Sequence, residues 1–355
     1  MINVGIIGCG YWGPKLIRNF YEIANSNLAL ICDMDNLKLQ QIQRQYPNVA
    51  TTTNFYDLLK DNIDAVVIAT PVNSHYELVK EALKQHKHVL VEKRMTASSK
   101  EAEELVNLAA RQNRILMVGH IYEYHPAVDY LKQLIKSGEL GEIYSIDAHR
   151  LNLGLFRSDV NVLWDLGPHD LSIVLSLMDK EPIMVSARGS GHLDPNLCDL
   201  AYLELIFPGN TSAHIHLSWL DPRKVRQVTI IGSKKMAFYD DVAEAEKIFL
   251  YDKRCAYVPP KKDISTAACP PRYHYGDVTI PFITSMEPLK IECSHFLQCI
   301  QDGVTPRTDG VAALKVISIL EAANQSILVG GQRIELNPVT VARKPIQKEF
   351  IDIRC

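Results

Sequence analysis

The 355-residue sequence has no Cys-x-x-Cys pair, because its eight cysteines are scattered along the chain. This spacing argues against a disulfide framework or a zinc knuckle, and the expected location is a reducing cytoplasm. The opening residues lack the basic region and apolar core of a signal peptide. The longest clean apolar stretch, around Ala65–Ala69, is far shorter than the roughly 20 residues of a membrane-spanning helix. We therefore expect no membrane segment.

Neither sign of charge is in excess. The 38 Lys and Arg residues oppose 41 Asp and Glu residues, which gives a net charge of −3. Without a basic excess or a long run of like charge, nucleic acid and anionic membranes are not expected partners. The hydrophobic content of 47% excludes disorder of the whole chain. At about 150 residues per domain, the length predicts roughly two domains.

Up to about residue 120, short apolar runs alternate with segments of helical spacing. The predicted strands are 3–8, 28–32, 63–69, 88–92 and 115–119, and the predicted helices are 12–24, 37–45, 74–85 and 98–111. Ser74 and Glu77 have the spacing of a capping box, and Ser98 or Ser99 is the expected cap of the last helix. The alternation predicts a doubly wound parallel sheet, a Rossmann domain, over residues 1–122.

After Pro126 the pattern changes to longer segments of strict alternation, which are typical of half-buried strands in an antiparallel or mixed sheet. The predicted strands are 143–151, 183–189, 201–207, 211–219, 225–232 and 247–251, and the predicted helices are 127–137, 289–301 and 311–328. The five prolines in 256–281 indicate a long loop. We expect an α+β domain over 123–355, with a C-terminal helix packing back on the first domain.

A glycine-rich motif lies between the first predicted strand and helix. Gly8, Gly10 and Gly13 form G-x-G-x-x-G, and Asp33 follows at the end of the second predicted strand. In this context the glycines allow a tight turn, close approach of a pyrophosphate, and helix packing on the strand. A carboxylate at Asp33 binds ribose hydroxyls and repels a 2′-phosphate, which favours NAD(H) over NADP(H). The alternatives are a glycine turn without a ligand and an aspartate that only caps a turn.

Candidate reactive residues follow other predicted strands. Lys93 lies at the end of the strand 88–92, where a lysine can bind a substrate hydroxyl. Taken alone, however, a lysine at this position is more often a surface residue. Asp165 and His169 are four apart and share a face if their segment is helical. A histidine titrates near pH 6.5, which suits a base that accepts a hydroxyl proton, but a structural histidine is the plain alternative.

The motifs Gly8–Gly13, Asp33, Ala69–Pro71, His88–Lys93 and Asp165-x-x-x-His169 together resemble the Gfo/Idh/MocA oxidoreductase family, over essentially the whole chain. The resemblance implies a Rossmann domain followed by an open-faced, mostly antiparallel sheet that mediates assembly as a homodimer or homotetramer. It also implies nicotinamide-dependent oxidation or reduction of a sugar or cyclitol hydroxyl. The resemblance further implies that the catalytic residues are Lys93, Asp165 and His169, and that His169 is the general acid/base.

Within this family, Gly10–Pro14, Arg150–Gly154 and Asp159–Asp165 resemble the UDP-N-acetylglucosamine 3-dehydrogenase group. The implied substrate is a UDP-linked N-acetylated sugar or its uronic acid, and the implied target is its 3-hydroxyl. The expected cofactor-binding residues are Gly8, Gly10, Tyr11, Trp12, Gly13, Asp33, Thr70, Pro71, Asn73, His75, Glu92 and Lys93. The expected substrate-binding residues are Arg94, Tyr124, Arg150, Asn152, Arg157, Asn161, Trp164 and His169, and no metal site is expected.

Arg94 departs from the family pattern, which has proline after the Glu-Lys pair. Because a cis bond before a non-proline residue costs about 2.5–4 kcal/mol, Lys93–Arg94 is expected to be trans, or else strained, with Lys93 aimed differently than in the family. Arg94 either adds a cation that favours an anionic substrate, together with Lys93, Arg150 and Arg157, or marks a repurposed or impaired site.

Three other functions stay open. The first is a dehydrogenase or ketoreductase of a free sugar or cyclitol. The second is a nicotinamide-binding protein without redox turnover, which Arg94 motivates. The third is redox-assisted glycoside cleavage on the same fold. The sequence does not identify the sugar, the nucleotide, the direction of the reaction or the number of subunits.

Overall fold

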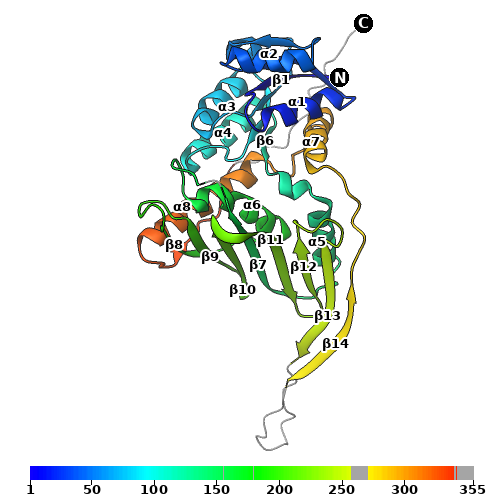
Figure 1. The fold of residues 1–355 in the computed structure, drawn as a ribbon, viewed down its shortest axis with the longest axis vertical. Helices are drawn as coiled ribbons and strands as arrows, with labels where there is room; N and C mark the ends of the chain where they lie inside the picture. Colours follow the sequence, from blue (N-terminus) through cyan, green and yellow to red (C-terminus); the bar gives the residue numbers. More distant parts are fainter. Residues whose placement is uncertain (155, 179, 257–270, 340, 342–355) are drawn as a thin grey trace, which may run out of the picture. The chain divides into compact units, whose positions relative to one another are not determined.

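The computed structural model describes residues 1–339 and 341, except 155, 179 and 257–270. In its described part the chain forms two compact units (Figure 1). Unit 1 comprises Met1–Tyr124 and Met286–Ser318, and unit 2 comprises His125–Ser285 and Ile319–Pro338. The predicted fold class is confirmed: unit 1 has a six-stranded parallel sheet with helices, and unit 2 has a nine-stranded, mostly antiparallel sheet.

The sheet of unit 1 has the order β3-β2-β1-β4-β5-β6. Its strands are β1 (Ile2–Ile7), β2 (Ser26–Cys32), β3 (Ala50–Thr52), β4 (Ala65–Ile68), β5 (His88–Glu92) and β6 (Leu116–Gly119), and its helices include α1 (Gly13–Glu22), α2 (Asn36–Gln45), α3 (His75–Lys84) and α4 (Ser99–Gln112). Every residue of β4 is buried and apolar, as a central parallel strand requires.

The strands of unit 1 end in register. Ile7 pairs with Cys32 and with Ile68, and Ile68 pairs with Val91. Further along β5, Glu92 pairs with Gly119 of β6. The residues that follow β1, β2, β4, β5 and β6 therefore lie along one edge of the sheet, the edge at which parallel sheets bind ligands.

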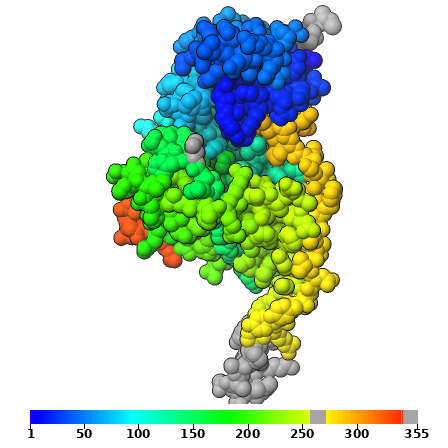
Figure 2. Space-filling view, in the orientation of Figure 1, coloured from blue at the N-terminus to red at the C-terminus, as the bar shows by residue number. Residues whose placement is uncertain are grey.

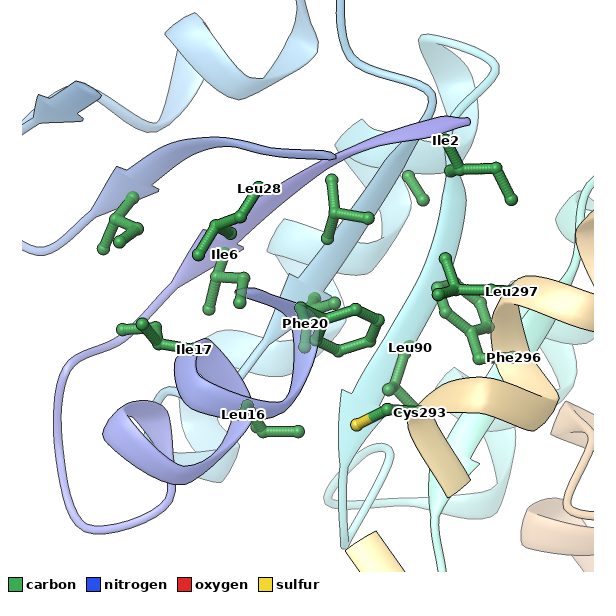
Figure 3. Packing of buried hydrophobic residues seen from close by; sticks show 14 of the residues in the cluster. Ile2, Ile6, Leu16, Ile17, Phe20, Leu28, Leu90, Cys293, Phe296 and Leu297 are labelled. Carbon is green, nitrogen blue, oxygen red and sulfur yellow. The ribbon is translucent and has the colours of Figure 1, made fainter. Parts of the chain in front are cut away.

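Helix α7 (Pro288–Asp302) comes late in the chain and packs in unit 1 (Figure 3). Phe296 meets Phe20 of α1 edge to face, with their ring centroids 6.4 Å apart, and Cys293 and Leu297 are buried beside them. Burial of this apolar face ties α7 to the N-terminal strands and helices.

Unit 2 is built on a sheet of order β14-β13-β12-β11-β7-β10-β9-β8-β15. Its strands are β7 (Ile143–Leu153), β8 (Met184–Ser190), β9 (Leu200–Phe207), β10 (Thr211–Ser218), β11 (Leu220–Gly232), β12 (Met236–Asp240), β13 (Ile248–Ala256), β14 (Arg272–Thr279) and β15 (Ile334–Glu335), and its helices are α5 (Pro126–Lys136), α6 (Val162–Leu177) and the second half of α8 (Gly310–Leu328). Helix α6 packs on β7, β9 and β10.

Two local expectations need correction. The segment 256–281 is not only a loop, because Arg272–Thr279 form β14, which pairs with β13; residues 257–270 lie outside the described residues. Ser74 makes no capping hydrogen bond to α3, because its hydroxyl donates to the carbonyl of Pro71, whereas Ser98 caps α4 as predicted. Helix α8 is long and apolar enough to cross a membrane by length and composition alone, but half of its most apolar window is buried within the protein.

A buried ion pair fixes α6 on the sheet. Arg150 of β7 is 4% exposed and Asp170 of α6 is 2% exposed. The guanidinium donates to both carboxylate oxygens, with Nε 2.5 Å from Oδ2 and Nη2 3.1 Å from Oδ1. Because two parallel hydrogen bonds join the guanidinium to the carboxylate, this pair sets the position of the helix that carries Asp165 and His169.

Replacing Asp170 by alanine leaves a buried guanidinium without its carboxylate. We expect Asp170→Ala to lower the free energy of unfolding by about 3–5 kcal/mol, measured by urea denaturation. Asp159→Ala is the matched control, because Asp159 pairs with Arg157 at the surface, where both side chains are about half exposed. That variant is expected to lose at most about 1 kcal/mol, and equal losses in the two variants would contradict the assignment.

Candidate active site

The glycine-rich loop joins β1 to α1 at the carboxyl edge of the unit 1 sheet. Gly8 has a φ of +101°, and a Cβ added there would lie 2.5 Å from the carbonyl oxygen of Ala69. A Cβ at Gly13 would lie 2.0 Å from the carbonyl oxygen of Gly8. Only glycine fits at these two positions, because any side chain would separate the strand from its helix.

Gly10 shows that the loop fits a dinucleotide. A Cβ added at Gly10 meets nothing within 4 Å, so this backbone faces open space. Trp12 at the N-cap of α1 makes no side-chain hydrogen bond to the first turn, which leaves the start of the helix to a ligand. Bare backbone in front of a helix N-terminus is the arrangement that binds a pyrophosphate.

Asp33, which follows β2, also binds the backbone of the glycine-rich loop through its carboxylate. Its Oδ2 accepts a hydrogen bond from the backbone N–H of Cys9 at 2.6 Å, and its Oδ1 accepts from the N–H of Asp35 at 2.9 Å. The carboxylate therefore caps a turn, which was the plainer of the two sequence interpretations. This does not exclude binding of ribose hydroxyls, because a carboxylate has about four acceptor positions.

Lys15, in the first turn of α1, is a residue that the sequence reasoning missed. Its ammonium lies 3.7 Å from the ring centroid of Tyr11 and 4.4 Å from that of Trp12, and these two rings meet edge to face. The contact places a cation in the first turn of α1, near the expected phosphate position. A basic residue two positions after the last glycine of the motif is the signal that would have revealed it.

Thr70, Pro71, Asn73 and His75 follow β4, at the same edge. The Thr70 hydroxyl donates a hydrogen bond to Ser74 Oγ at 2.8 Å, because the Ser74 hydroxyl itself donates to the Pro71 carbonyl. The His75 ring is 1% exposed, with Nε2 2.8 Å from the Thr70 carbonyl oxygen and Nδ1 2.7 Å from the Arg94 carbonyl oxygen. Burial lowers the pKa of His75, and a neutral imidazole donates to one of these carbonyls at a time. His75 thus bridges the segments after β4 and β5.

The Lys93–Arg94 peptide bond is cis, so the expectation of a trans bond is wrong. That expectation rested only on the general preference of non-proline bonds for the trans form. The Lys93 N–H donates to Glu92 Oε2 at 3.3 Å, and the Arg94 carbonyl oxygen contacts His75.

Glu92 and His120 lie at the ends of the neighbouring strands β5 and β6, where Glu92 pairs with Gly119. A Cβ added at Gly119 would lie 3.3 Å from Glu92 Oε2, so the carboxyl lies over this glycine. Burial raises the pKa of Glu92 to about 7, partly offset by the charge of Lys93. Burial and then the charge of Lys93 lower the pKa of His120 to about 4. At neutral pH His120 is therefore a neutral imidazole.

Glu292 of α7 is a second buried carboxyl, which sequence reasoning also missed. It is 1% exposed, and its Oε1 has no hydrogen-bond partner among the described residues. Burial, followed by the charges of Glu92 and Glu123, raises its pKa well above the ordinary value. Burial therefore favours the protonated form of Glu292, because an isolated buried carboxylate is costly.

Asp165 and His169 lie on α6 in unit 2, and the helix gives them the shared face that their spacing predicts. Asp165 Oδ2 accepts a hydrogen bond from Trp219 Nε1 at 3.2 Å, and Arg157 Nη1 lies 3.8 Å from Asp165 Oδ1. Trp219 orients the carboxylate, and no sequence motif identified it. The pair is thus an oriented acid next to an imidazole on one rigid helix.

The other expected substrate residues of unit 2 have local partners. Asn161 caps α6 by accepting from the N–H of Trp164 at 3.1 Å, and Arg157 binds Asp159 through two hydrogen bonds. Asn152 lies near the end of β7 and is partly exposed. Arg150 is engaged by Asp170 inside unit 2, so we assign it to the fold.

Tyr124 is a core residue of unit 1. It is fully buried, and its hydroxyl lies 3.0 Å from Thr308 Oγ1. Its expected role in substrate binding has no support in this geometry.

Within the described ranges, no group of three or more His, Cys, Asp or Glu side chains is arranged to hold a metal ion.

Comparisons with known proteins agree with this geometry. Residues 2–120 match the family model described as "Oxidoreductase family, NAD-binding Rossmann fold", and residues 128–238 match the GFO/IDH/MocA C-terminal domain. The chain is 27% identical over 334 residues to UDP-N-acetylglucosamine 3-dehydrogenase of Acidithiobacillus ferrooxidans, which covers 90% of this chain and 98% of that protein. A crystal structure of that enzyme superposes with a TM-score of 0.75, covering 92% of this chain and 96% of the other.

Two further relatives mark the range of the family. A 2,7-anhydro-N-acetylneuraminate hydratase of Escherichia coli is 29% identical over 231 residues, which is 60% of each protein. An oxidoreductase from Agrobacterium radiobacter, solved with NAD+, L-tartaric acid and magnesium, has a TM-score of 0.77 at 18% identity, covers 94% of this chain and 98% of its own, and shows the shared fold alone. With both family models matched in order along the chain, the protein belongs to the Gfo/Idh/MocA family of NAD-binding oxidoreductases.

Proposed function

We propose that the protein is an NAD-dependent dehydrogenase of a nucleotide-linked sugar, acting on the 3-hydroxyl of a UDP-N-acetylhexosamine or its uronic acid. The observation that carries this proposal is the Asp165–His169 pair on one face of α6, in a chain whose unit 1 has a complete dinucleotide loop. The similarity to a UDP-N-acetylglucosamine 3-dehydrogenase over 90% of the chain supports the choice of substrate.

The roles of the residues follow from their chemistry. His169 accepts the proton of the substrate hydroxyl, and Asp165, oriented by Trp219, stabilises the imidazolium that forms. Lys93 binds the hydroxyl oxygen and polarises it. When bound, the dinucleotide supplies the nicotinamide that accepts the hydride, so one hydride and one proton leave the alcohol and a ketone remains.

Arg157 is the cation of unit 2 that we propose for an anionic group of the substrate. Its bond to Asp159 lies at the surface, where ion pairs contribute at most about 1 kcal/mol. Arg94, Asn152, Asn161 and Trp164 stay candidates for contacts to the sugar.

We also propose a cytoplasmic location for the protein. Cysteines of the described part, among them Cys9, Cys32, Cys293 and Cys299, are free thiols.

The catalytic assignment predicts separate losses in two variants. With UDP-N-acetylglucosamine and NAD+, we expect His169→Ala to lower kcat by about 10²- to 10⁴-fold, because it removes the general base. Lys93→Ala is expected to lower kcat/KM by a similar factor, measured by NADH absorbance. Lys100→Ala, an exposed lysine on α4, is the control and keeps the parent rate. Parent turnover that survives in both variants would refute the assignment, and parent turnover of free N-acetylglucosamine or myo-inositol alone would refute the nucleotide-sugar substrate.

We propose that the enzyme uses NAD(H) in preference to NADP(H), because Asp33 places a negative charge at the end of β2. Asp33→Asn keeps an oxygen acceptor for the Cys9 N–H and removes the charge. We expect its ratio of NADP+ to NAD+ affinity to rise by about tenfold, or about 1.4 kcal/mol, in calorimetric titrations. Asp35→Asn, two residues away, is the control. An unchanged ratio in Asp33→Asn would contradict this role of the charge.

Copies of the chain are proposed to assemble, as a homodimer or homotetramer, through the sheet of unit 2. Beyond β12, strands β13 and β14 continue as a two-stranded ribbon, which Figure 2 shows as a narrow yellow projection. Tyr273 is 65% exposed, Tyr275 is 76% exposed, and their rings stack at 6.3 Å. A ribbon of two strands is only marginally stable alone in water, so exposed aromatic residues on an edge strand favour burial against another chain.

Disrupting the ribbon is expected to reduce the oligomer. We expect the double variant Tyr273→Asp with Tyr275→Asp to shift the mass measured by light scattering after size exclusion toward the monomer. Tyr56→Asp is the control, because Tyr56 is 66% exposed in unit 1 and outside the ribbon. A parent that is monomeric at micromolar concentration, or an unchanged mass in the ribbon variant, would contradict assembly through this surface.

A further inference from the structure

His120 stands out among the buried polar side chains of unit 1. It is 2% exposed, and neither Nδ1 nor Nε2 has a hydrogen-bond partner among the described residues. A neutral imidazole has one donor and one acceptor, and leaving either of them unsatisfied in the interior destabilises the fold. Native proteins keep such groups rarely, and a functional site is one of the few reasons.

His75 shows that this pattern is not general for buried histidines of this unit. It is as buried as His120, yet both of its nitrogens lie within 2.8 Å of a carbonyl oxygen. The two histidines follow neighbouring parts of the same sheet edge. The ring nitrogens of His75 contact backbone carbonyls, whereas those of His120 have no hydrogen-bond partner among the described residues.

The backbone holds His120 in a fixed place. Its N–H donates to the Val118 carbonyl at 2.7 Å, and its own carbonyl accepts from the Glu123 N–H at 3.0 Å. Val118 is in turn tied to the buried Thr308, because their backbones bond at 2.9 Å and the Thr308 hydroxyl donates to the Val118 carbonyl. Backbone hydrogen bonds therefore hold the turn that carries the unsatisfied imidazole, and a fixed backbone is what a preorganised binding group requires.

The strand register places this turn at the ligand edge. Because Glu92 pairs with Gly119, Lys93 and His120 are the next residues on neighbouring strands. The glycine loop and Asp33 follow β1 and β2, so they take the adenosine and pyrophosphate part of a dinucleotide. The other nucleoside then extends over β4, β5 and β6. His120 comes at the end of β6.

We propose that His120 binds the nicotinamide nucleoside of the dinucleotide, with the imidazole donating one hydrogen bond and accepting another. The carboxamide and the ribose hydroxyls of this nucleoside each offer both a donor and an acceptor, which match the two free positions of the ring. The inference rests on the proposed function, because it assumes that the chain binds NAD(H).

The experiment compares ligands that contain or lack this nucleoside. In calorimetric or fluorescence titrations, His120→Leu is expected to bind NADH about three- to tenfold more weakly than the parent, and ADP with unchanged affinity. His120→Asn, which keeps one donor and one acceptor, should recover part of the loss. ADP-ribose then locates the contact: a loss as large as that with NADH assigns it to the ribose, and a smaller loss assigns it to the nicotinamide. Both results support the proposal.

A second readout separates binding from folding. Because His120→Leu removes unsatisfied polar atoms, its thermal midpoint without ligand is expected to equal or exceed that of the parent. His75→Leu removes contacts to two carbonyls and is expected to lower the midpoint. The proposal is overturned if NADH binds His120→Leu as tightly as the parent, or if NADH and ADP lose affinity equally. A parent that binds no NADH refutes the proposed function itself, whereas an unaffected His120→Leu refutes only this inference.

Discussion

The parallel register of β1, β4, β5 and β6 is the constraint on which the site in unit 1 depends. Strands that end level bring Gly8, Thr70, Lys93 and His120 to one edge, although more than a hundred residues separate the first from the last. Within two residues of its end, each strand is followed by a polar residue or by a glycine of unusual backbone conformation. A shift of one residue in any of these pairs would turn that side chain to the other face.

The same edge is also where unit 1 buries ionisable groups. Folding raises the pKa of Glu92 from 4.5 to about 7, and that of Glu292 well above its usual range. The folded protein therefore holds protons that the unfolded chain releases. This contribution to stability is complete below pH 4.5 and is lost as the pH rises, for Glu92 through pH 7. The protein therefore loses some stability in the physiological pH range. Such a loss is understandable at a ligand site, because a bound ligand gives the charged and unsatisfied polar groups at this edge their partners.

The alternation of hydrophobic residues and the glycine motif were enough to predict both sheets and the position of the glycine-rich loop, because these depend on local pattern. The helix that carries Asp165 and His169 was only a condition of the prediction, and the structure supplies it as α6. The remaining features depend on contacts between distant segments. His75 bridges two strand ends, Trp219 orients Asp165, and α7 brings Glu292 into unit 1, and none of these has a local signature. The trans expectation for Lys93–Arg94 rested on the general preference of non-proline bonds, and it was wrong. The ribbon strand β14 was missed because prolines flank it.

The structure separates two arginines that the sequence analysis grouped together. Arg150 and Arg157 were both expected to bind an anionic substrate, but their carboxylate partners differ in burial. Exchanging the buried Asp170 for a substrate anion would leave a carboxylate in the interior, which costs several kcal/mol. Exchanging the half-exposed Asp159 costs at most about 1 kcal/mol. Only Arg157 can therefore release its partner for a ligand, and Arg150 supports recognition indirectly, by fixing the helix that carries the proposed base.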